Sequence, residues 1–166
     1  MAAAEAAKTE HGIIVQDTAW AGYEEIPSWI MQGYGTLVLE ADKQLKENGV
    51  DRPTHVFVQA GVGSLAGAVV GYFAHKYKEN PPVMVVCEAS AADCLYRSAV
   101  QADGNLVNVT GDLQTIMAGL ACGEGNTIGW EGKHQRMGHP EEPCNRLRIL
   151  PRLDECQGNT YLCKSS

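Results

Sequence analysis

A strand, a glycine-rich loop and a helix are predicted in succession between residues 54 and 80. Thr54–Gln59 is an apolar run rich in β-branched residues, which predicts a strand, and Leu65–Lys78 has small and apolar residues at helical spacing. The loop between them consists of Ala60, Gly61, Val62, Gly63 and Ser64. A helix N-terminus carries unpaired N–H groups and a partial positive charge, and glycines let the backbone approach an anion closely. The loop is therefore predicted to hold a phosphate, with the Ser64 hydroxyl as an additional donor.

The rest of the chain alternates between strand and helix patterns. Strands are predicted at residues 13–16 and 83–88, and helices from Pro27 to the Asn48-Gly49 stop, at 91–100 and at 115–121. The second of these strands is almost wholly apolar, as is typical of parallel strands buried on both faces. The pattern predicts an α/β fold with a parallel sheet and flanking helices in three αβα layers.

The character of the sequence changes at Gly132. Residues 132–166 lack periodicity and hold three of the six cysteines, with one short apolar run at 147–150. Residues 1–131 are therefore predicted to form one domain, followed by an irregular or disordered tail at 132–166.

Charge and composition exclude several classes of partner. The formal net charge is −7, which disfavours binding to nucleic acid or to an anionic membrane, and no apolar run approaches the roughly 18–20 residues of a membrane span. The six cysteines form no C-x-x-C pair, so no metal site is predicted. Without a recognisable secretory signal, we expect a cytoplasmic protein with reduced thiols, including Cys94 and Cys122.

The glycine loop alone leaves other interpretations open. It could be a tight turn whose glycines serve packing, or a dinucleotide loop, since Gly61, Gly63 and Ala66 approach the Gly-x-Gly-x-x-Gly pattern. The acidic residue needed for a ribose is poorly placed, because Glu88 stands 27 residues after Gly61, against the usual offset of about 20.

Two acidic residues follow predicted strands. Asp17 comes after residues 13–16, at a sheet edge where ligands bind in open α/β folds, so it could act as a general base or simply cap a turn. Glu88 is at the C-terminal end of the strand predicted at 83–88 and could contact a cofactor or cap the helix predicted near Ala91, and the cap is favoured.

Several motifs together resemble one known family. They lie at residues 15–20 (Val-Gln-Asp-Thr-Ala-Trp), 22–23, 26–34, 59–63, 92–98, 115–124 and 129–131. Over residues 5–131 the chain resembles diaminopropionate ammonia-lyases, which belong to the tryptophan-synthase-β-like, fold type II enzymes that use pyridoxal phosphate (PLP). The resemblance implies a partial domain of that fold.

The resemblance also implies an activity and roles for individual residues. The family converts 2,3-diaminopropionate to pyruvate and ammonia by α,β-elimination, with PLP as the electron sink. Residues 60–64 match the loop that holds the PLP phosphate, and Asp17 matches an active-site carboxylate that can serve as the base. The implied partners are this small amino-acid substrate and a second copy of the chain in a homodimer.

The family's Schiff-base lysine has no match in the chain. That lysine lies well upstream of the motif containing Asp17, where only Lys8 occurs, in an alanine-rich context that does not match. The family's partner for the pyridine nitrogen is also missing, and the resemblance ends after Glu131. We therefore expect a fragment from a truncated or frame-shifted gene that has little lyase activity alone. The alternative is a non-catalytic remnant that binds a phosphorylated small molecule or nucleotide.

Overall fold

The computed structural model describes residues 12–101, 103–130 and 147–150. Its helices are α2 (Glu25–Glu47), α3 (Ser64–Lys76), α4 (Cys94–Gln101) and the short 3-10 helix η1 (Ala118–Leu120). Its strands are β1 (His55–Gln59), β2 (Val83–Cys87) and β3 (Leu147–Leu150), and residues 127–130 are also helical.

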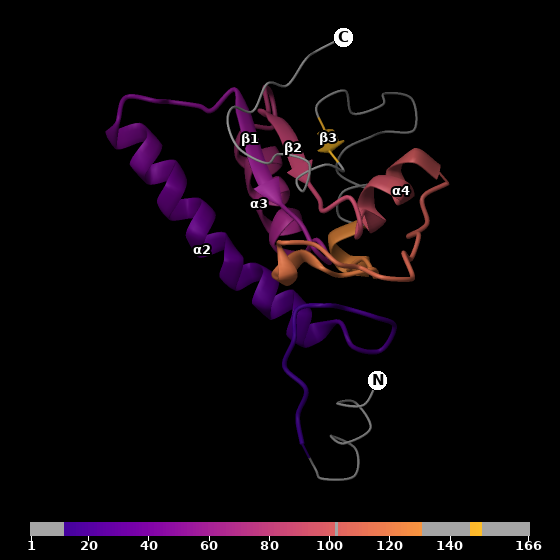
Figure 1. The fold of residues 1–166 in the computed structure, drawn as a ribbon. Helices are drawn as coiled ribbons and strands as arrows, with labels where there is room; N and C mark the ends of the chain where they lie inside the picture. The colour runs from indigo at the N-terminus through magenta and orange to yellow at the C-terminus, as the bar shows by residue number, and fades with distance from the viewer. Residues whose placement is uncertain (1–11, 102, 131–146, 151–166) are drawn as a thin grey trace.

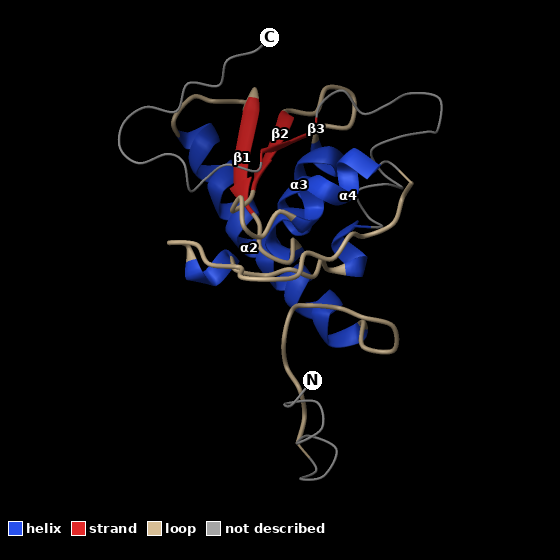
Figure 2. Ribbon diagram, turned by 45° about the vertical axis from the view of Figure 1, so that its right-hand side comes forward, coloured by secondary structure: helices blue, strands red, loops and turns tan. Residues whose placement is uncertain are grey.

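The three strands form one parallel sheet in the order β1-β2-β3 (Figure 2). Helix α3 makes the crossover between β1 and β2, because parallel neighbours cannot be joined by a tight hairpin. Strand β2 lies between the other two strands, and its three central residues are buried. The apolar run at 83–88 therefore forms the buried central strand that its composition predicts, and the predicted parallel α/β architecture is confirmed.

Helix α2 lies alongside α3, beside the sheet (Figure 1). The helix ends as predicted, with Asn48 at its C-cap and Gly49 at a φ of 77°, which glycine adopts at little cost. Asp42 of α2 is buried and accepts hydrogen bonds from Lys76 (2.6 Å) and Tyr77 (2.7 Å) at the far end of α3. These polar contacts fix how the two helices pack.

The strand predicted at residues 13–16 is absent. These residues lack ladder partners within the described part of the chain, and Ile13 and Val15 are 82% and 70% exposed. The Tyr23 hydroxyl instead donates to the Ile14 carbonyl (2.8 Å) and accepts from the Gln16 N–H (3.1 Å). A β-branched run favours an extended backbone, but a strand also needs a neighbour with which to pair.

Two further expectations, for residues 115–121 and for the tail after residue 131, differ from the structure. Of the helix predicted at residues 115–121, only η1 forms, and the Thr115 hydroxyl accepts the N–H of Met117 (3.2 Å), a local bond that competes with a helical turn. The expectation of an irregular tail is wrong for residues 147–150, because β3 adds to the edge of β2. The rest of that tail lies outside the described residues.

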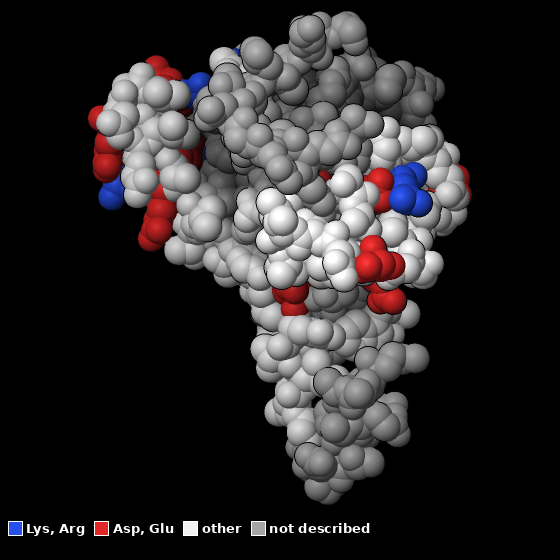
Figure 3. Space-filling model, viewed as in Figure 1, with Lys and Arg blue, Asp and Glu red and all other residues white. Residues whose placement is uncertain are grey.

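Charged side chains are distributed over the visible surface without a large basic patch among the described residues (Figure 3). None of the described helices is both long and apolar enough to span a bilayer.

Candidate functional site

The glycine loop continues directly from the end of β1. The Ala60 N–H still bonds to the Cys87 carbonyl (2.9 Å), so the sheet orients the chain up to this residue. Gly63 then takes a φ of 94° at the N-cap of α3. A side chain at this position would be strained, so the glycine is required by the turn itself.

The first turn of α3 is suited to an anion. The first intrahelical bond runs from the Gly67 N–H to the Gly63 carbonyl (2.8 Å), so the N–H groups of Ser64, Leu65 and Ala66 precede it. They donate to no acceptor within the described residues, no side chain caps the helix, and its first turn has no acidic residue. Ser64 and Ala66 are also buried. Buried N–H groups need an acceptor, and a phosphate group is an acceptor whose negative charge matches the partial positive charge of the helix N-terminus.

Gly61 is closely packed against the segment that follows η1. A Cβ at this position would lie 3.3 Å from the Leu120 Cα and 3.4 Å from the Cys122 Sγ. The Cys94 Sγ contacts the Gly61 carbonyl on another side, at 3.9 Å. The packing interpretation of the loop is therefore correct for Gly61, while Gly63 is needed for its backbone conformation.

Cys94 and Cys122 both lie beside Gly61 and form no disulfide within the described part of the chain. Burial, and secondly the charge of Glu88, raises the pKa of Cys94 to about 12. Burial and the charge of Asp17 also raise the pKa of Cys122. A hydrogen bond from the Val62 N–H offsets part of this increase. Both side chains are therefore neutral thiols at physiological pH, and they act as small packing groups.

Asp17 lies beside the glycine loop, although no strand precedes it. Its backbone carbonyl accepts hydrogen bonds from the Ser64 hydroxyl (2.8 Å) and from the Asn126 side-chain amide (2.7 Å). Its carboxylate Oδ2 accepts a hydrogen bond from the Tyr34 hydroxyl (2.9 Å). Among the described residues this carboxylate is bonded to the Tyr34 hydroxyl and not to a backbone N–H, so Asp17 does not cap a turn.

Ser64 contributes differently from the sequence-based expectation. Its hydroxyl donates its only proton to the Asp17 carbonyl and accepts a hydrogen bond from Asn126 (2.6 Å). The side chain is almost fully buried. The hydroxyl therefore anchors the Asp17 segment, and only the backbone N–H of Ser64 is directed by the helix turn toward an anion.

Asn126, which the sequence analysis did not identify, connects these parts. Its side chain is fully buried, its N–H donates to the Val62 carbonyl (2.7 Å), and its Oδ1 accepts the N–H of Ile128 (3.0 Å) at the start of the helical residues 127–130. One residue thus joins the Asp17 segment, the glycine loop and a third segment. Nothing in the local pattern around Asn126 indicates this role, because its partners in the other two segments are distant in sequence.

Glu88 is a helix cap, as favoured by its position in the sequence. Its two carboxylate oxygens accept the N–H groups of Leu95 (3.0 Å) and Tyr96 (2.7 Å) in the first turn of α4, and it is fully buried. A carboxylate held in this way is not presented to a ribose, which disfavours the dinucleotide interpretation of the loop.

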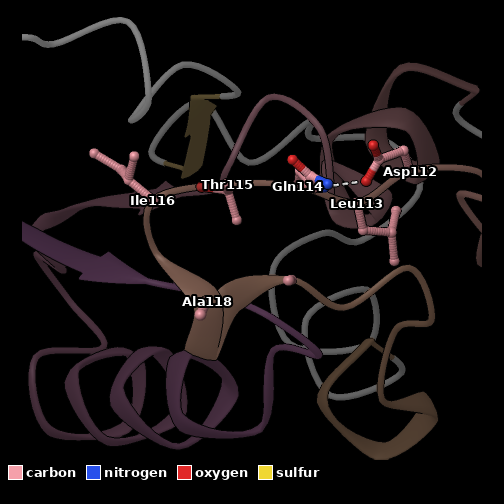
Figure 4. Close-up of a pocket in the computed structure, with 7 residues that line it drawn as sticks. Asp112, Leu113, Gln114, Thr115, Ile116 and Ala118 are labelled. Carbon is pink, nitrogen blue, oxygen red and sulfur yellow. Dashed lines mark hydrogen bonds between the residues drawn. The ribbon is translucent and has the colours of Figure 1, made fainter.

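A pocket among the described residues lies next to this cluster rather than in it. It has a volume of about 670 Å³. Its lining residues are Asp112, Leu113, Gln114, Thr115, Ile116, Ala118 and Ala121 (Figure 4). None of these is a predicted site residue, but the neighbouring Leu120 and Gly119 contact the position of Gly61. The pocket is therefore a surface hollow beside the glycine loop.

Comparisons with known proteins give a consistent family. Residues 1–136 match the model of the pyridoxal-phosphate-dependent enzymes. The chain is 59% identical over 124 residues to diaminopropionate ammonia-lyase from Salmonella typhimurium and 56% identical over 123 residues to that from Escherichia coli K12. These alignments cover 75% and 74% of this chain, but only 31% and 30% of the relatives. The chain thus spans about a third of the length of the curated relatives.

Solved structures agree with this assignment. The crystal structure of E. coli diaminopropionate ammonia-lyase in complex with D-serine aligns with a TM-score of 0.70 and 50% identity, over 78% of this chain and 31% of that one. The T.th. threonine deaminase aligns with a TM-score of 0.58 and 20% identity, over 73% and 39% of the two chains, which shows a shared fold. The predicted partial fold type II domain is confirmed. The chain belongs to the family of pyridoxal-phosphate-dependent enzymes.

Proposed function

We propose that this chain forms the phosphate-binding part of a diaminopropionate ammonia-lyase and carries the base of its reaction, Asp17. The observation that supports this most is the pair of bonds from Ser64 and Asn126 to the Asp17 carbonyl. They hold the backbone of Asp17 next to the uncapped first turn of α3. Asp17 and the glycine loop, which the family resemblance assigns to one site, are thus neighbours in the fold.

The chemistry follows from this arrangement. The N–H groups of Ser64, Leu65 and Ala66 would bind the phosphate of PLP, which supplies the electron sink when bound. Asp17 would remove the Cα proton of 2,3-diaminopropionate, and the electron pair of that bond would expel the protonated β-amino group as ammonia. Water would then hydrolyse the resulting 2-aminoacrylate to pyruvate and a second ammonia. A carboxylate can act as this base because no Lys or Arg among the described residues forms an ion pair with it.

The described lysines lie far from this site. Lys46 and Lys76 bind Asp42, Lys43 pairs with Glu47, and Lys78 pairs with Glu79. Lys43 and Lys46 lie in the C-terminal half of α2, and Lys76 and Lys78 lie at or just beyond the C-terminal end of α3, whereas the glycine loop precedes the first turn of α3. Lys8, Lys133 and Lys164 lie outside the described residues. We therefore propose that the chain alone binds PLP without a Schiff base and has little lyase activity.

A chemical trapping experiment tests the missing Schiff base. The protein is incubated with PLP, reduced with borohydride and analysed by mass spectrometry. We expect no lysine to carry a PLP adduct and no sustained release of pyruvate from 2,3-diaminopropionate. A stoichiometric adduct or robust turnover would contradict the proposal.

Proton abstraction is tested separately. In D₂O with PLP and 2,3-diaminopropionate, loss of the Cα proton signal is followed by NMR. We expect the protein to accelerate this loss beyond PLP alone, and Asp17→Asn to remove most of the acceleration. The proposal would be contradicted if the protein did not accelerate proton loss, or if Asp17→Asn were as fast as the wild type. The chain would then be a remnant that binds a phosphorylated molecule without catalysis.

The location and assembly of the protein are further parts of the proposal. We propose a cytoplasmic protein that pairs with a second copy, as the family resemblance implies. Size-exclusion chromatography with light scattering tests the homodimer, and a monomer at all accessible concentrations would contradict it.

A further inference from the structure

The carboxylate of Asp17 is held separately from its backbone. Ser64 and Asn126 fix the backbone carbonyl, and the Tyr23 hydroxyl fixes the preceding residues through Ile14 and Gln16. None of these bonds restricts rotation of the Asp17 side chain. The rotation of this side chain is restricted by Tyr34, which lies in the first half of α2. Its hydroxyl donates a hydrogen bond to Oδ2 of Asp17 (2.9 Å).

This contact leaves one carboxylate oxygen available. Within the described residues, Oδ2 is bonded to Tyr34, whereas Oδ1 accepts no hydrogen bond. A carboxylate held by one oxygen keeps a defined orientation and still presents a lone pair on the other. This is the arrangement that a positioned general base requires.

We infer that Tyr34 is a positioning residue for the proposed base: its hydroxyl holds Oδ2 of Asp17 so that Oδ1 faces the Cα proton of the bound amino acid. The inference rests on the proposed function, in which Asp17 is that base. It adds a residue that acts through Asp17 and not on the substrate directly.

Two uncharged groups of the described residues interact with the Asp17 carboxylate. The Tyr34 hydroxyl from α2 donates a hydrogen bond to it, and the Cys122 thiol after η1 is close enough for the charge of Asp17 to raise its pKa. Burial, the hydrogen bond to Asp17 and the charge of Asp17 all raise the pKa of Tyr34. The hydroxyl therefore stays protonated at physiological pH and remains a hydrogen-bond donor.

The contact is tested in solution through the ionisation of Tyr34. Phenolate absorbance is titrated in the wild type and in Asp17→Asn, and the corresponding Tyr34→Phe proteins are subtracted to isolate this tyrosine. We expect the pKa of Tyr34 to fall in Asp17→Asn, because the charge of Asp17 is removed and a neutral amide oxygen is a weaker acceptor than a carboxylate. An unchanged Tyr34 titration would overturn the inference, and this readout depends on no catalytic activity.

The functional consequence is tested by the loss of the Cα proton signal in D₂O with PLP and 2,3-diaminopropionate. We expect Tyr34→Phe to slow proton loss by about tenfold to a hundredfold, as misplaced catalytic groups do, with PLP affinity unchanged. Tyr96→Phe, which removes a hydroxyl from α4, should match the wild type.

The two proposals fail in different ways. If Asp17→Asn is slow but Tyr34→Phe is as fast as the wild type, the role of Tyr34 is wrong and that of Asp17 stands. If Asp17→Asn is as fast as the wild type, both are wrong. If Tyr34→Phe does not fold, the Asp17→Asn titration still decides whether the contact exists.

Discussion

The side chain of Ser64 illustrates what can and cannot be inferred at the scale of single residues. Its place after Gly63 predicted a phosphate donor, and the glycine loop itself lies where the sequence places it. The hydroxyl, however, is bonded to Asp17 and Asn126, which are 47 and 62 residues away in the chain. Local pattern predicts which residues form a turn, because the turn depends on its own backbone. It does not predict side-chain partners brought together by the tertiary fold.

Ser64→Ala separates the two roles of this residue. We expect the free energy of unfolding to fall by about 1 kcal/mol, because a buried hydroxyl and its bonds are lost. Affinity for PLP should remain within about twofold, because the phosphate is bound by backbone N–H groups. Chemical denaturation and equilibrium dialysis measure the two quantities. A large loss of PLP affinity in a stable Ser64→Ala protein would show that the hydroxyl binds the phosphate after all.

At the scale of elements, the order of strands and helices from Pro27 to Gln101 follows from the sequence. Helix periodicity, the Asn48-Gly49 stop and the apolar run at 83–88 each predict their element, because each depends on local backbone preference and burial. Apart from residues 115–121, where a local bond of Thr115 competes with a helical turn, the errors occur where pairing with another strand decides the structure. Residues 13–16 have the composition of a strand but no described neighbour, whereas residues 147–150 pair with β2.

The contact between α2 and α3 should make stability depend on acid. Burial opposes ionisation of Asp42, but bonds from Lys76, Tyr77 and Lys46 outweigh it and lower its pKa to about 2. A carboxyl whose pKa is lower in the folded state stabilises the fold above its unfolded pKa of 3.8. This contribution, on the order of 2 kcal/mol, is lost as the pH falls from about 4 to about 2.

Denaturation measured across this pH range tests the contribution of Asp42. Asp42→Asn should be less stable near neutral pH and should lose most of this acid dependence. Glu47→Gln is the matched control, because its pair with Lys43 is exposed and worth little. If Asp42→Asn retained the wild-type acid dependence, another group would have to be responsible.

Glu88 gives a second prediction for an element. Glu88→Ala leaves the Leu95 and Tyr96 N–H groups without their carboxylate acceptor in the first turn of α4, and should destabilise the protein by about 1–3 kcal/mol. Amide hydrogen exchange should accelerate first at Leu95 and Tyr96. Unchanged protection of these amides would show that Glu88 is not the cap that holds α4.

At the scale of the whole molecule, the described part exposes several large apolar side chains. Ile13, Trp29, Phe57 and Ile116 are each more than half exposed. Exposed apolar surface promotes association, so we expect the protein to form oligomers as its concentration rises. The extended Ile13 segment and the edge strand β1 are at different places in the fold (Figure 1). Association would therefore involve more than one surface.

The central claim is that the glycine loop binds PLP through its phosphate. Equilibrium dialysis of PLP and of pyridoxal, which lacks the phosphate, tests it directly in the wild type and in Gly63→Ala. Gly63 has a φ of 94°, so the alanine strains the turn that directs the N–H groups. Gly33→Ala is the control, because an alanine there meets no atom within 4 Å and lies in α2.

We predict that the wild type and Gly33→Ala bind PLP at least about tenfold more tightly than pyridoxal. Inorganic phosphate should compete with PLP, and Gly63→Ala should lose the preference for the phosphorylated compound. Equal binding of PLP and pyridoxal by the wild type, or an unchanged preference in Gly63→Ala, would contradict the account.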